Sequence, residues 1–292
     1  MDRAGAVALA CLLALAGCSA VPGGSTPQGT LTPAPVPESS TGTERLAPGL
    51  TSEGVTSPLT LANAHGAALK RSHRFHSNRT VRYRNGTVHA RADQRTTVGP
   101  NGFRSTVSVA GRPGFVTSGP PTEATFWSNG TVLVERIQRG GDTRYRYLDD
   151  ETYNRGAGFY NSLRRPKPWW DHYALFTAVE SRVVGRSATD GETGYTVIGE
   201  RLRDPAVFSA AADVRRPENV SLRATVTERG LVQSFELSYD GTLRNGEHVH
   251  VTRSVVYDVT AVSPIDRPSW FEAARNGSSD SRGSIPNPRL TG

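Results

Sequence analysis

Residues 221–259 read SLRATVTERGLVQSFELSYDGTLRNGEHVHVTRSVVYDV and contain the clearest strand pattern of the chain. Apolar and polar side chains alternate over 221–228, 231–240 and 247–259, as expected for strands that bury one face. Glycine-containing pairs between these three runs are typical of tight turns. We therefore predict an antiparallel meander whose inward side chains are apolar: Leu222, Ala224, Val226, Phe235, Leu237, Tyr239, Val249, Val251, Val255 and Tyr257.

Strand signals continue upstream of this meander. Asn85-Gly86 and Asn129-Gly130 are each flanked by residues with strand character, and Asn-Gly between such runs is a strong hairpin signal. Other candidate strands have alternating or β-branched residues: 103–109, 142–148, 182–185 and 195–200. We expect about nine to eleven strands in total, with antiparallel connections.

A few helices are expected to interrupt the strands. Residues 59–71 place apolar residues at helical spacing, and residues 169–179 follow prolines that the first turn of a helix tolerates. Asp204-Pro205 is typical of a capped helix start, and residues 268–275 predict a short closing helix. Together these patterns predict an α+β fold, mainly antiparallel β, in which two or three helices interrupt one long, curved sheet.

The N-terminus has the pattern of an export signal. Residues 4–17 are almost wholly apolar, and about 14 residues is shorter than the roughly 20 that a membrane-spanning helix needs. The segment ends in Leu-Ala-Gly-Cys at 15–18, which resembles a bacterial or archaeal lipobox. We predict a signal peptide at 1–17 and a diacylglyceryl anchor on Cys18, which holds the chain at the outer face of a cell membrane. The alternative is an ordinary signal peptide with a chance cysteine.

The remaining chain divides by composition. Residues 18–58 carry the lipidated cysteine and are rich in Pro, Thr, Ser and Gly, which is typical of a disordered tether. Residues 59–275 contain the predicted strands and helices and form one β-rich domain. Residues 276–292 are polar and predict a disordered tail. Cys11 and Cys18 are the only cysteines, so we predict no disulfide and no cysteine metal site in the mature domain.

The charge of the chain bears on its partners. The formal net charge is +7, and arginine supplies it because Lys70 and Lys167 are the only lysines. A basic surface attracts nucleic acid or anionic lipid headgroups. The arginines are scattered, and no basic helix or aromatic-interleaved motif occurs. We therefore predict no nucleic-acid partner and favour the membrane surface.

Five N-glycosylation sequons occur in the chain. Each asparagine falls at a predicted turn or strand edge, where a glycan projects into solvent. Together with the lipobox, the sequons indicate an exported archaeal glycoprotein. The candidate acceptor residues are Asn78, Asn85, Asn129, Asn219 and Asn276.

Histidine and carboxylate clusters are the candidates for metal or catalytic chemistry. His248 and His250 point the same way on a strand, opposite to the apolar residues, so we interpret them as solvated, and His73 and His76 in the same way. The run Asp149–Glu151 is interpreted as a loop. No nucleophile elbow, phosphate loop or zinc-protease motif occurs. We therefore predict no catalytic residue, no metal site, no cofactor and no enzymatic activity.

The aromatic helix at 169–179 is the candidate ligand site. Trp169, Tyr173 and Phe176 form one stripe with Trp170 beside it, and a helix of this kind must bury most of that surface. The helix either fills the concave side of the sheet as ordinary core or covers a cavity for an acyl or isoprenoid chain. For the second case the candidate cavity lining is Trp169, Trp170, Tyr173, Phe176, Phe235, Leu237 and Tyr239.

Several segments resemble an uncharacterised family of haloarchaeal lipoproteins. They are spread over most of the chain and comprise the lipobox, the tether, 62–69, 80–87, 127–131 and 228–232. At fold level this family resembles the LolA/LppX class of lipoprotein carriers. The resemblance implies an open half-barrel of antiparallel strands, covered on its concave face by a few helices, with an apolar cavity that binds lipids or acyl chains.

These expectations combine into one functional hypothesis. The chain is expected to be a membrane-anchored extracytoplasmic lipoprotein whose domain binds a hydrophobic or lipid-like ligand without catalysing a reaction. Two alternatives stay open, namely a structural or adhesive cell-envelope protein without a ligand cavity, and a surface hydrolase. A filled interior favours the first alternative, and polar groups that converge in a cleft favour the second.

Overall fold

The computed structural model is described for parts of residues 43–277, so the predicted signal peptide and Cys18 lie outside the described residues. The described residues are 43–69, 72–111, 122–149, 168–189, 191–210, 214–259 and 261–277.

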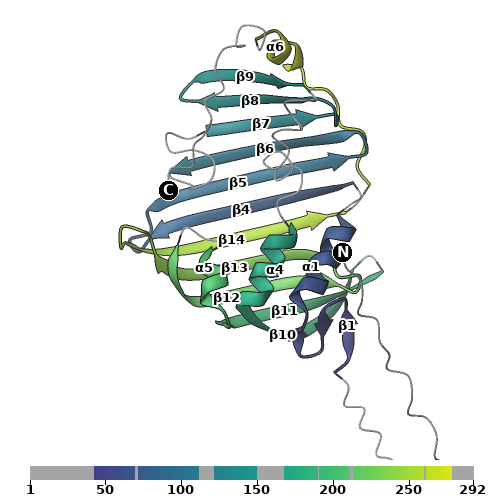
Figure 1. Cartoon of the computed structure of the whole chain (residues 1–292), viewed down its shortest axis with the longest axis vertical. Coiled ribbons are helices and arrows are strands. Elements are labelled where there is room, and N and C mark those ends of the chain that lie inside the picture. The colour runs from purple at the N-terminus through teal and green to yellow at the C-terminus, as the bar shows by residue number, and fades with distance from the viewer. Residues whose placement is uncertain are drawn as a thin grey trace, which may run out of the picture. The chain divides into compact units, whose positions relative to one another are not determined.

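Eleven antiparallel strands form one large open sheet (Figure 1). Its order is β10-β11-β12-β13-β14-β4-β5-β6-β7-β8-β9, so β10 and β9 are the two edges. The last strand, β14, pairs with β4 and thereby joins the two halves of the chain into one sheet. The strands are β4 (His73–Tyr83), β5 (Val88–Gly99), β6 (Gly102–Gly111), β7 (Thr122–Ser128), β8 (Leu133–Arg139), β9 (Asp142–Leu148), β10 (Val179–Thr189), β11 (Glu192–Leu202), β12 (Arg215–Thr227), β13 (Val232–Thr242) and β14 (His248–Asp258).

The predicted Asn-Gly turns connect β4 to β5 and β7 to β8. Asn85 Oδ1 accepts a hydrogen bond from the Thr87 amide at 3.0 Å, and Asn129 Oδ1 accepts one from the Thr131 amide at 3.1 Å. Such bonds hold a tight turn without help from distant residues. The two hairpins, the C-terminal meander and the mainly antiparallel α+β class are confirmed, although most strands are longer than the sequence pattern indicated.

Four described helices accompany the sheet: α1 (Pro58–Ala68), α4 (Pro168–Ala178), α5 (Pro205–Ala210) and α6 (Phe271–Gly277). Helices α1 and α4 pack against each other, and α5 packs against α4 and β12. Figure 1 shows these three helices over the β10–β14 half of the sheet, and we call the side on which they lie the inner face. None of the described helices is long and apolar enough to cross a membrane. Helix cover over the whole concave face stays a prediction.

Two apolar clusters follow the inner face. The first lies between β10–β14 and helices α1 and α4, and it includes Leu61, Phe176 and Val251. The second extends across β5–β9. Its members are Val98, Phe103, Val107, Val109, Ala124, Phe126, Leu133 and Leu148.

The strand register places both clusters on the same face. Residues paired across neighbouring antiparallel strands point to the same side of a sheet. Tyr257 on β14 and Phe126 on β7 belong to one register row, in which Phe75, Thr96 and Ser105 lie between them. Tyr257 contacts the ring of His65 in α1, so this row lies on the inner face. A third cluster, which contains Trp127, lies on the opposite, outer face beneath α6.

The structure corrects the predicted extent of the tether. Three short strands that form their own sheet occupy the segment assigned to a disordered tether ending at residue 58: β1 (Arg45–Ala47), β2 (Leu50–Thr51) and β3 (Gly54–Val55). Leu50 is fully buried. Gly54 has φ +130°, and a Cβ at this position would lie 2.0 Å from the Ser181 carbonyl oxygen of β10. Glycine here permits close packing, which composition does not distinguish from linker flexibility.

Candidate functional site

Two buried histidines meet on the inner face. His65 in α1 and His172 in α4 are buried, and their rings stack with centroids 4.1 Å apart and 27° between their planes. His65 lies one helical turn from both Leu61 and Leu69, which are also buried. Tyr257 of β14 completes the group, with its ring edge-on to His65 at 4.7 Å. The cluster therefore joins α1, α4 and the centre of the sheet.

His65 is held in its neutral form. Its Nδ1 accepts a hydrogen bond from the Val232 amide at 3.2 Å, so the single proton of the neutral ring is on Nε2. Burial lowers the pKa of His65 well below its ordinary value, and the nearby His172 and His73 lower it further. Within the described part of the chain, His65 Nε2 has no hydrogen-bond partner. His65 is thus uncharged where its ring contacts that of His172.

An ion pair lies beside these rings. Arg253 of β14 donates a hydrogen bond to Asp171 of α4 at 2.8 Å, and the two side chains are 29% and 27% exposed. The Arg253 guanidinium also lies over the Phe235 ring, 5.4 Å from its centroid. Burial raises the pKa of the neighbouring Tyr257 hydroxyl, so this hydroxyl stays protonated. Asp171 is therefore the anion that balances Arg253.

The predicted cavity lining falls partly within this region. Four of its side chains are buried in the first apolar cluster: Phe176, Phe235, Leu237 and Tyr239. Tyr173 is half-buried on α4, whereas the side chains of Trp169 and Trp170 lie outside the described residues. The ring of His172 contacts that of Phe235 edge-on at 5.6 Å, so α4 does lie against β13. That these residues line a ligand cavity stays a prediction.

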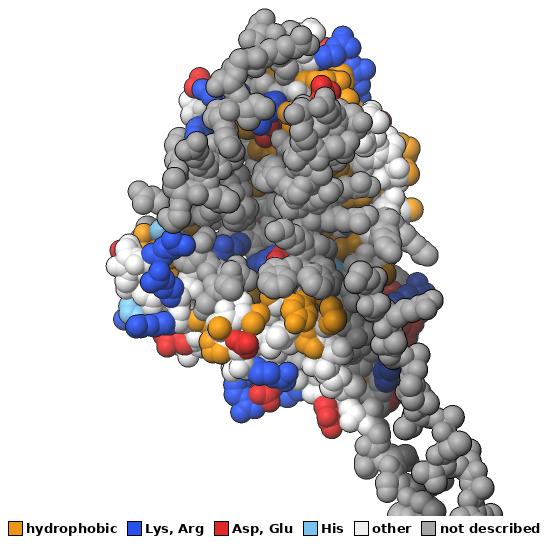
Figure 2. All heavy atoms as spheres, in the orientation of Figure 1, with side chains coloured by type: hydrophobic (Ala, Val, Ile, Leu, Met, Phe, Trp, Pro, Cys, Tyr) orange, Lys and Arg blue, Asp and Glu red, His pale blue; other side chains and the backbone are white. Residues whose placement is uncertain are grey.

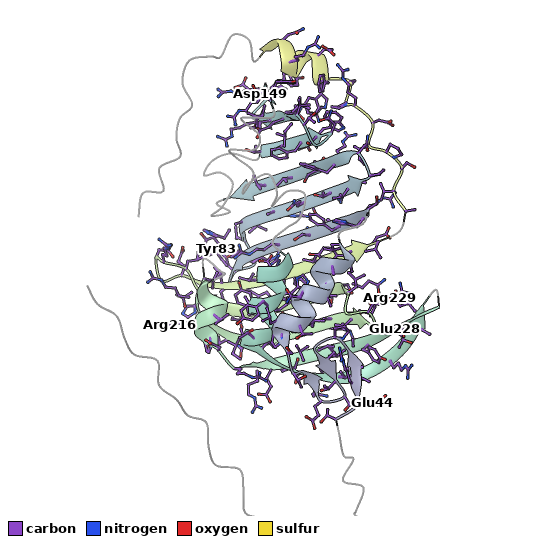
Figure 3. All side chains as sticks on the ribbon, turned by 45° about the vertical axis from the view of Figure 1, so that its right-hand side comes forward. Glu44, Tyr83, Asp149, Arg216, Glu228 and Arg229 are labelled. Carbon is purple, nitrogen blue, oxygen red and sulfur yellow. The ribbon has the colours of Figure 1, made fainter. Side chains whose placement is uncertain are left out.

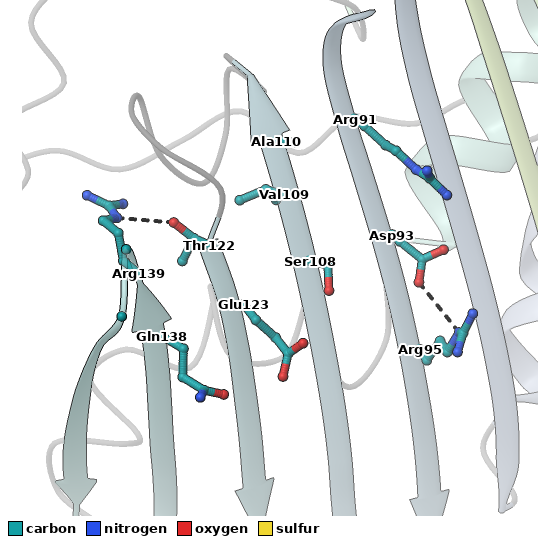
Figure 4. A pocket seen from close by; sticks show the side chains of 12 residues that line it. Arg91, Asp93, Arg95, Ser108, Val109, Ala110, Thr122, Glu123, Gln138 and Arg139 are labelled. Carbon is teal, nitrogen blue, oxygen red and sulfur yellow. Dashed lines mark hydrogen bonds and ion pairs between the residues drawn. The ribbon is translucent and has the colours of Figure 1, made fainter.

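A polar pocket of about 660 Å³ opens on the β5–β8 part of the sheet (Figure 4). Asp93 and Arg95 approach each other at 3.5 Å in its wall. Arg139 donates a hydrogen bond to the Thr122 hydroxyl at 3.1 Å, and Glu123 also lines the pocket. Charges of both signs are interspersed along this wall. The electrostatic potential of the pocket therefore does not have one predominant sign, as a site for a strongly charged partner would.

Basic side chains on the face shown in Figure 2 lie in several separate groups, interspersed with acidic ones. Arg201 pairs with Glu180 at 2.6 Å, and Arg74 lies 3.5 Å from Asp258. This distribution agrees with the scattered arginines of the sequence. The absence of a nucleic-acid partner stays a prediction.

The histidine pairs of the sequence differ in their surroundings. His248 and His250 are exposed on β14, as predicted. The prediction is wrong for His73, which is fully buried, while His76 is exposed. His73 begins β4 with the same parity as Phe75 and so faces inward. Among the residues that the structure describes, no group of three or more His, Cys, Asp or Glu side chains is placed to hold a metal ion.

The predicted acidic loop is described at one residue. Asp149 follows directly after the last residue of β9, outside regular structure, as expected for a loop (Figure 3). Asp150 and Glu151 lie outside the described residues.

Four of the five sequon asparagines are exposed: Asn85, Asn129, Asn219 and Asn276. Asn219 lies in an irregular part of β12, where Arg216 also has a positive φ. The prediction of a turn or strand edge is wrong for Asn78. This residue is half-buried within β4, between β14 and β5, and its amide donates a hydrogen bond to Asp93 at 3.1 Å. Glycan attachment at these sites stays a prediction.

No protein-family model matches the sequence, and no curated protein matches it. Solved structures do match, and two of them are the following. The match to lipoprotein LppX of Mycobacterium tuberculosis covers 72% of this chain and 97% of LppX, with 12% identity and a TM-score of 0.34. The match to MucB, solved in complex with MucA(peri), covers 71% of this chain and 57% of that chain, with 13% identity and a TM-score of 0.25.

Proposed function

We propose that the chain is a membrane-anchored extracytoplasmic lipoprotein that binds one hydrophobic or lipid-like molecule on the inner face of its sheet, without catalysing a reaction. The second apolar cluster is the observation that supports this function. It extends the helix-covered inner face across β5–β9 with buried apolar side chains on each strand, among which the polar Thr96, Ser105 and Glu135 are also buried. An apolar surface of this extent suits an acyl or isoprenoid chain.

The described helices are distributed unequally over the two clusters. Helices α1 and α4 contribute to the first cluster, whereas α6 contacts β8 and β9 from the outer face. Within the described residues, no helix packs extensively on the second cluster. An apolar chain laid on this cluster would gain roughly 25 cal/mol for each Å² of apolar surface removed from water.

The second cluster is already buried in the ligand-free chain, where Phe103 is 1% and Leu133 0% exposed. A ligand therefore reaches it only when part of the inner face is uncovered. The binding free energy is the gain from ligand contacts minus the cost of this uncovering. We expect long apolar chains to bind better than short ones, because the gain from ligand contacts increases with chain length.

The anchor determines where this domain meets its ligand. In this proposal the signal peptide at 1–17 is removed, Cys18 carries the lipid, and the following residues tether the domain outside the membrane. The exposed sequon asparagines carry glycans on the solvent side. A domain held in this way would exchange its ligand with the membrane that holds it.

Native mass spectrometry of the full chain, purified in mild detergent, tests the proposed function. We expect a bound lipid that is released by organic extraction. The Cys18→Ser chain is the matched control, because it lacks the covalent anchor and should still hold the non-covalent lipid. A lipid-free mass for both chains would contradict lipid binding.

A structural or adhesive cell-envelope protein without a ligand cavity is the second candidate. It is favoured by the close packing of the first cluster, where Phe176 of α4 and Val251 of β14 are almost completely buried. For this candidate we expect no co-purifying lipid and no binding of apolar probes. The same mass measurement therefore separates the two functions.

A further inference from the structure

Two arginines lie next to each other on the inner face of the sheet. Arg253 of β14 and Arg79 of β4 are register partners. Partners on adjacent antiparallel strands share a face, with Cβ atoms about 5 Å apart. Arg253 lies on the inner face because it contacts Asp171 of α4 and the ring of Phe235. Arg79 therefore belongs to the inner face as well.

One of these two cations is balanced by the chain itself. Asp171 pairs with Arg253 at 2.8 Å, whereas Arg79 makes no hydrogen bond or ion pair within the described residues. Arg79 is half-buried. Like charges on paired strand positions are destabilising, and a partly buried cation without an anion costs free energy. The arrangement leaves one positive charge that an anion from outside would stabilise.

Arg79 shares its face with apolar residues on both sides along β4, with Ser77 between it and Phe75. Phe75 and Val81 are buried on the same strand. In the register row of Arg79, Ala92 of β5 is followed by Val109 of β6, which belongs to the second cluster. With strands about 4.8 Å apart, Val109 lies about 10 Å from Arg79, and the cluster continues for about 14 Å to β9. A molecule with its charged end at Arg79 would thus lay its apolar part on the second cluster.

We infer that Arg79 binds the head of the ligand, and that the ligand is an amphiphile with one negative charge at its head. This deepens the proposed function and rests on it. Arg79, Arg253 and Asp171 together leave a single positive charge, which a carboxylate or a phosphodiester matches. The guanidinium fork of Arg79 donates two parallel hydrogen bonds to the paired oxygens of either group. An uncharged lipid would leave Arg79 without an anion.

Two fluorescent probes of equal chain length test this assignment on the full chain, one a long-chain fatty acid and the other the corresponding alcohol. We expect the acid to bind more tightly than the alcohol. Arg79→Gln should weaken binding of the acid about tenfold, or about 1.4 kcal/mol, and leave binding of the alcohol unchanged. Arg79→Lys keeps the charge but loses the guanidinium fork, so it should retain only part of the affinity for the acid. Arg91→Gln is the matched control, because Arg91 is exposed on the other face of β5.

The same measurement is repeated with labelled phosphatidylglycerol, whose head is a phosphodiester. If Arg79→Gln weakens binding of only one of the two lipids, the head group of that lipid is the anion that Arg79 binds. Inorganic phosphate alone should not displace the acid probe, and displacement would overturn the assignment to a lipid. Equal binding of acid and alcohol, or an equal loss in Arg79→Gln and Arg91→Gln, would overturn the role of Arg79 while leaving the proposed function intact. If neither probe binds the unaltered chain, the proposed function fails together with this inference.

Discussion

His65 and His172 stack at 4.1 Å where α1 meets α4, and both rings are buried. A proton added to either ring would place a positive charge in contact with the other imidazole and near His73, in surroundings where water cannot solvate it. The packing of α1 on α4 therefore depends on the neutral form of His65.

We expect the stability of the chain to fall as the pH decreases below about 6.5, the ordinary pKa of histidine. Because the pKa of His65 is lowered in the folded state, the unfolded chain binds this proton at a higher pH than the folded chain does. The contribution of His65 to stability is complete above the unfolded pKa and is lost as the pH falls toward the folded pKa. Urea unfolding between about pH 8 and pH 5 measures this change.

His65→Asn should reduce this dependence on pH. Asparagine has an oxygen that can accept the Val232 amide bond, and it does not titrate. His248→Asn is the control, because His248 is exposed on β14, and it should leave the dependence unchanged. An unaltered slope in His65→Asn would show that the stacked pair is not the acid-sensitive element.

Asp171→Asn should lower the free energy of unfolding by about 1–3 kcal/mol, because it leaves the Arg253 guanidinium without its anion in a partly buried position. The midpoint of denaturant unfolding measures the loss. Glu180→Gln breaks an exposed ion pair with Arg201 and should change the midpoint little. If both substitutions shift the midpoint equally, the Asp171–Arg253 pair contributes no more to stability than an exposed ion pair does.

Gly54→Ala should destabilise the segment at 45–55 by about 1–3 kcal/mol, because the new Cβ would meet the Ser181 carbonyl and the backbone has φ +130°. We expect faster proteolytic cleavage within this segment. Gly191→Ala is the control, since Gly191 has φ +78° with no atom within 4 Å of an added Cβ. Cleavage at the same rate in both chains would mean that β3 does not pack on β10 in solution.

Cys18→Ser should move the chain from the membrane fraction to the soluble fraction, because the thiol is the predicted site of the diacylglyceryl group. Cell fractionation and incorporation of labelled fatty acid measure the change. Cys11→Ser lies within the predicted signal peptide and should leave the mature protein lipidated. Continued membrane attachment of the Cys18→Ser chain would contradict the anchor.

Turns and helix caps could be predicted from the sequence, because hydrogen bonds between residues close in sequence stabilise them. The Asn85 and Asn129 turns hold themselves through side-chain bonds to the next residues. The cap of α5 is also local, since Asp204 accepts hydrogen bonds from the Ala206 and Val207 amides at 3.0 and 3.1 Å. The pairing of β14 with β4 could not be predicted, because it joins segments that are far apart in the sequence and depends on their tertiary packing.

The candidate site had a partial signal in the sequence. Arg253 interrupts the inward series of Val251 and Val255, and a charged residue at an inward position indicates a buried partner. His65 likewise occupies the buried stripe of α1, one turn from Leu61. The identity of each partner could not be predicted, because tertiary packing alone brings Asp171 of α4 to Arg253.

The decisive experiment places a photo-crosslinking side chain in β7, once on the inner face of the sheet and once on the outer face. Phe126 faces the second apolar cluster, whereas its neighbour Trp127 packs with α6 on the outer face, and both are buried. With p-benzoylphenylalanine in place of Phe126, light should join the chain to an added long-chain fatty acid, and the same residue in place of Trp127 should give no adduct. Equal yields at the two positions, or no adduct at position 126 in a folded chain, would contradict lipid binding on the inner face.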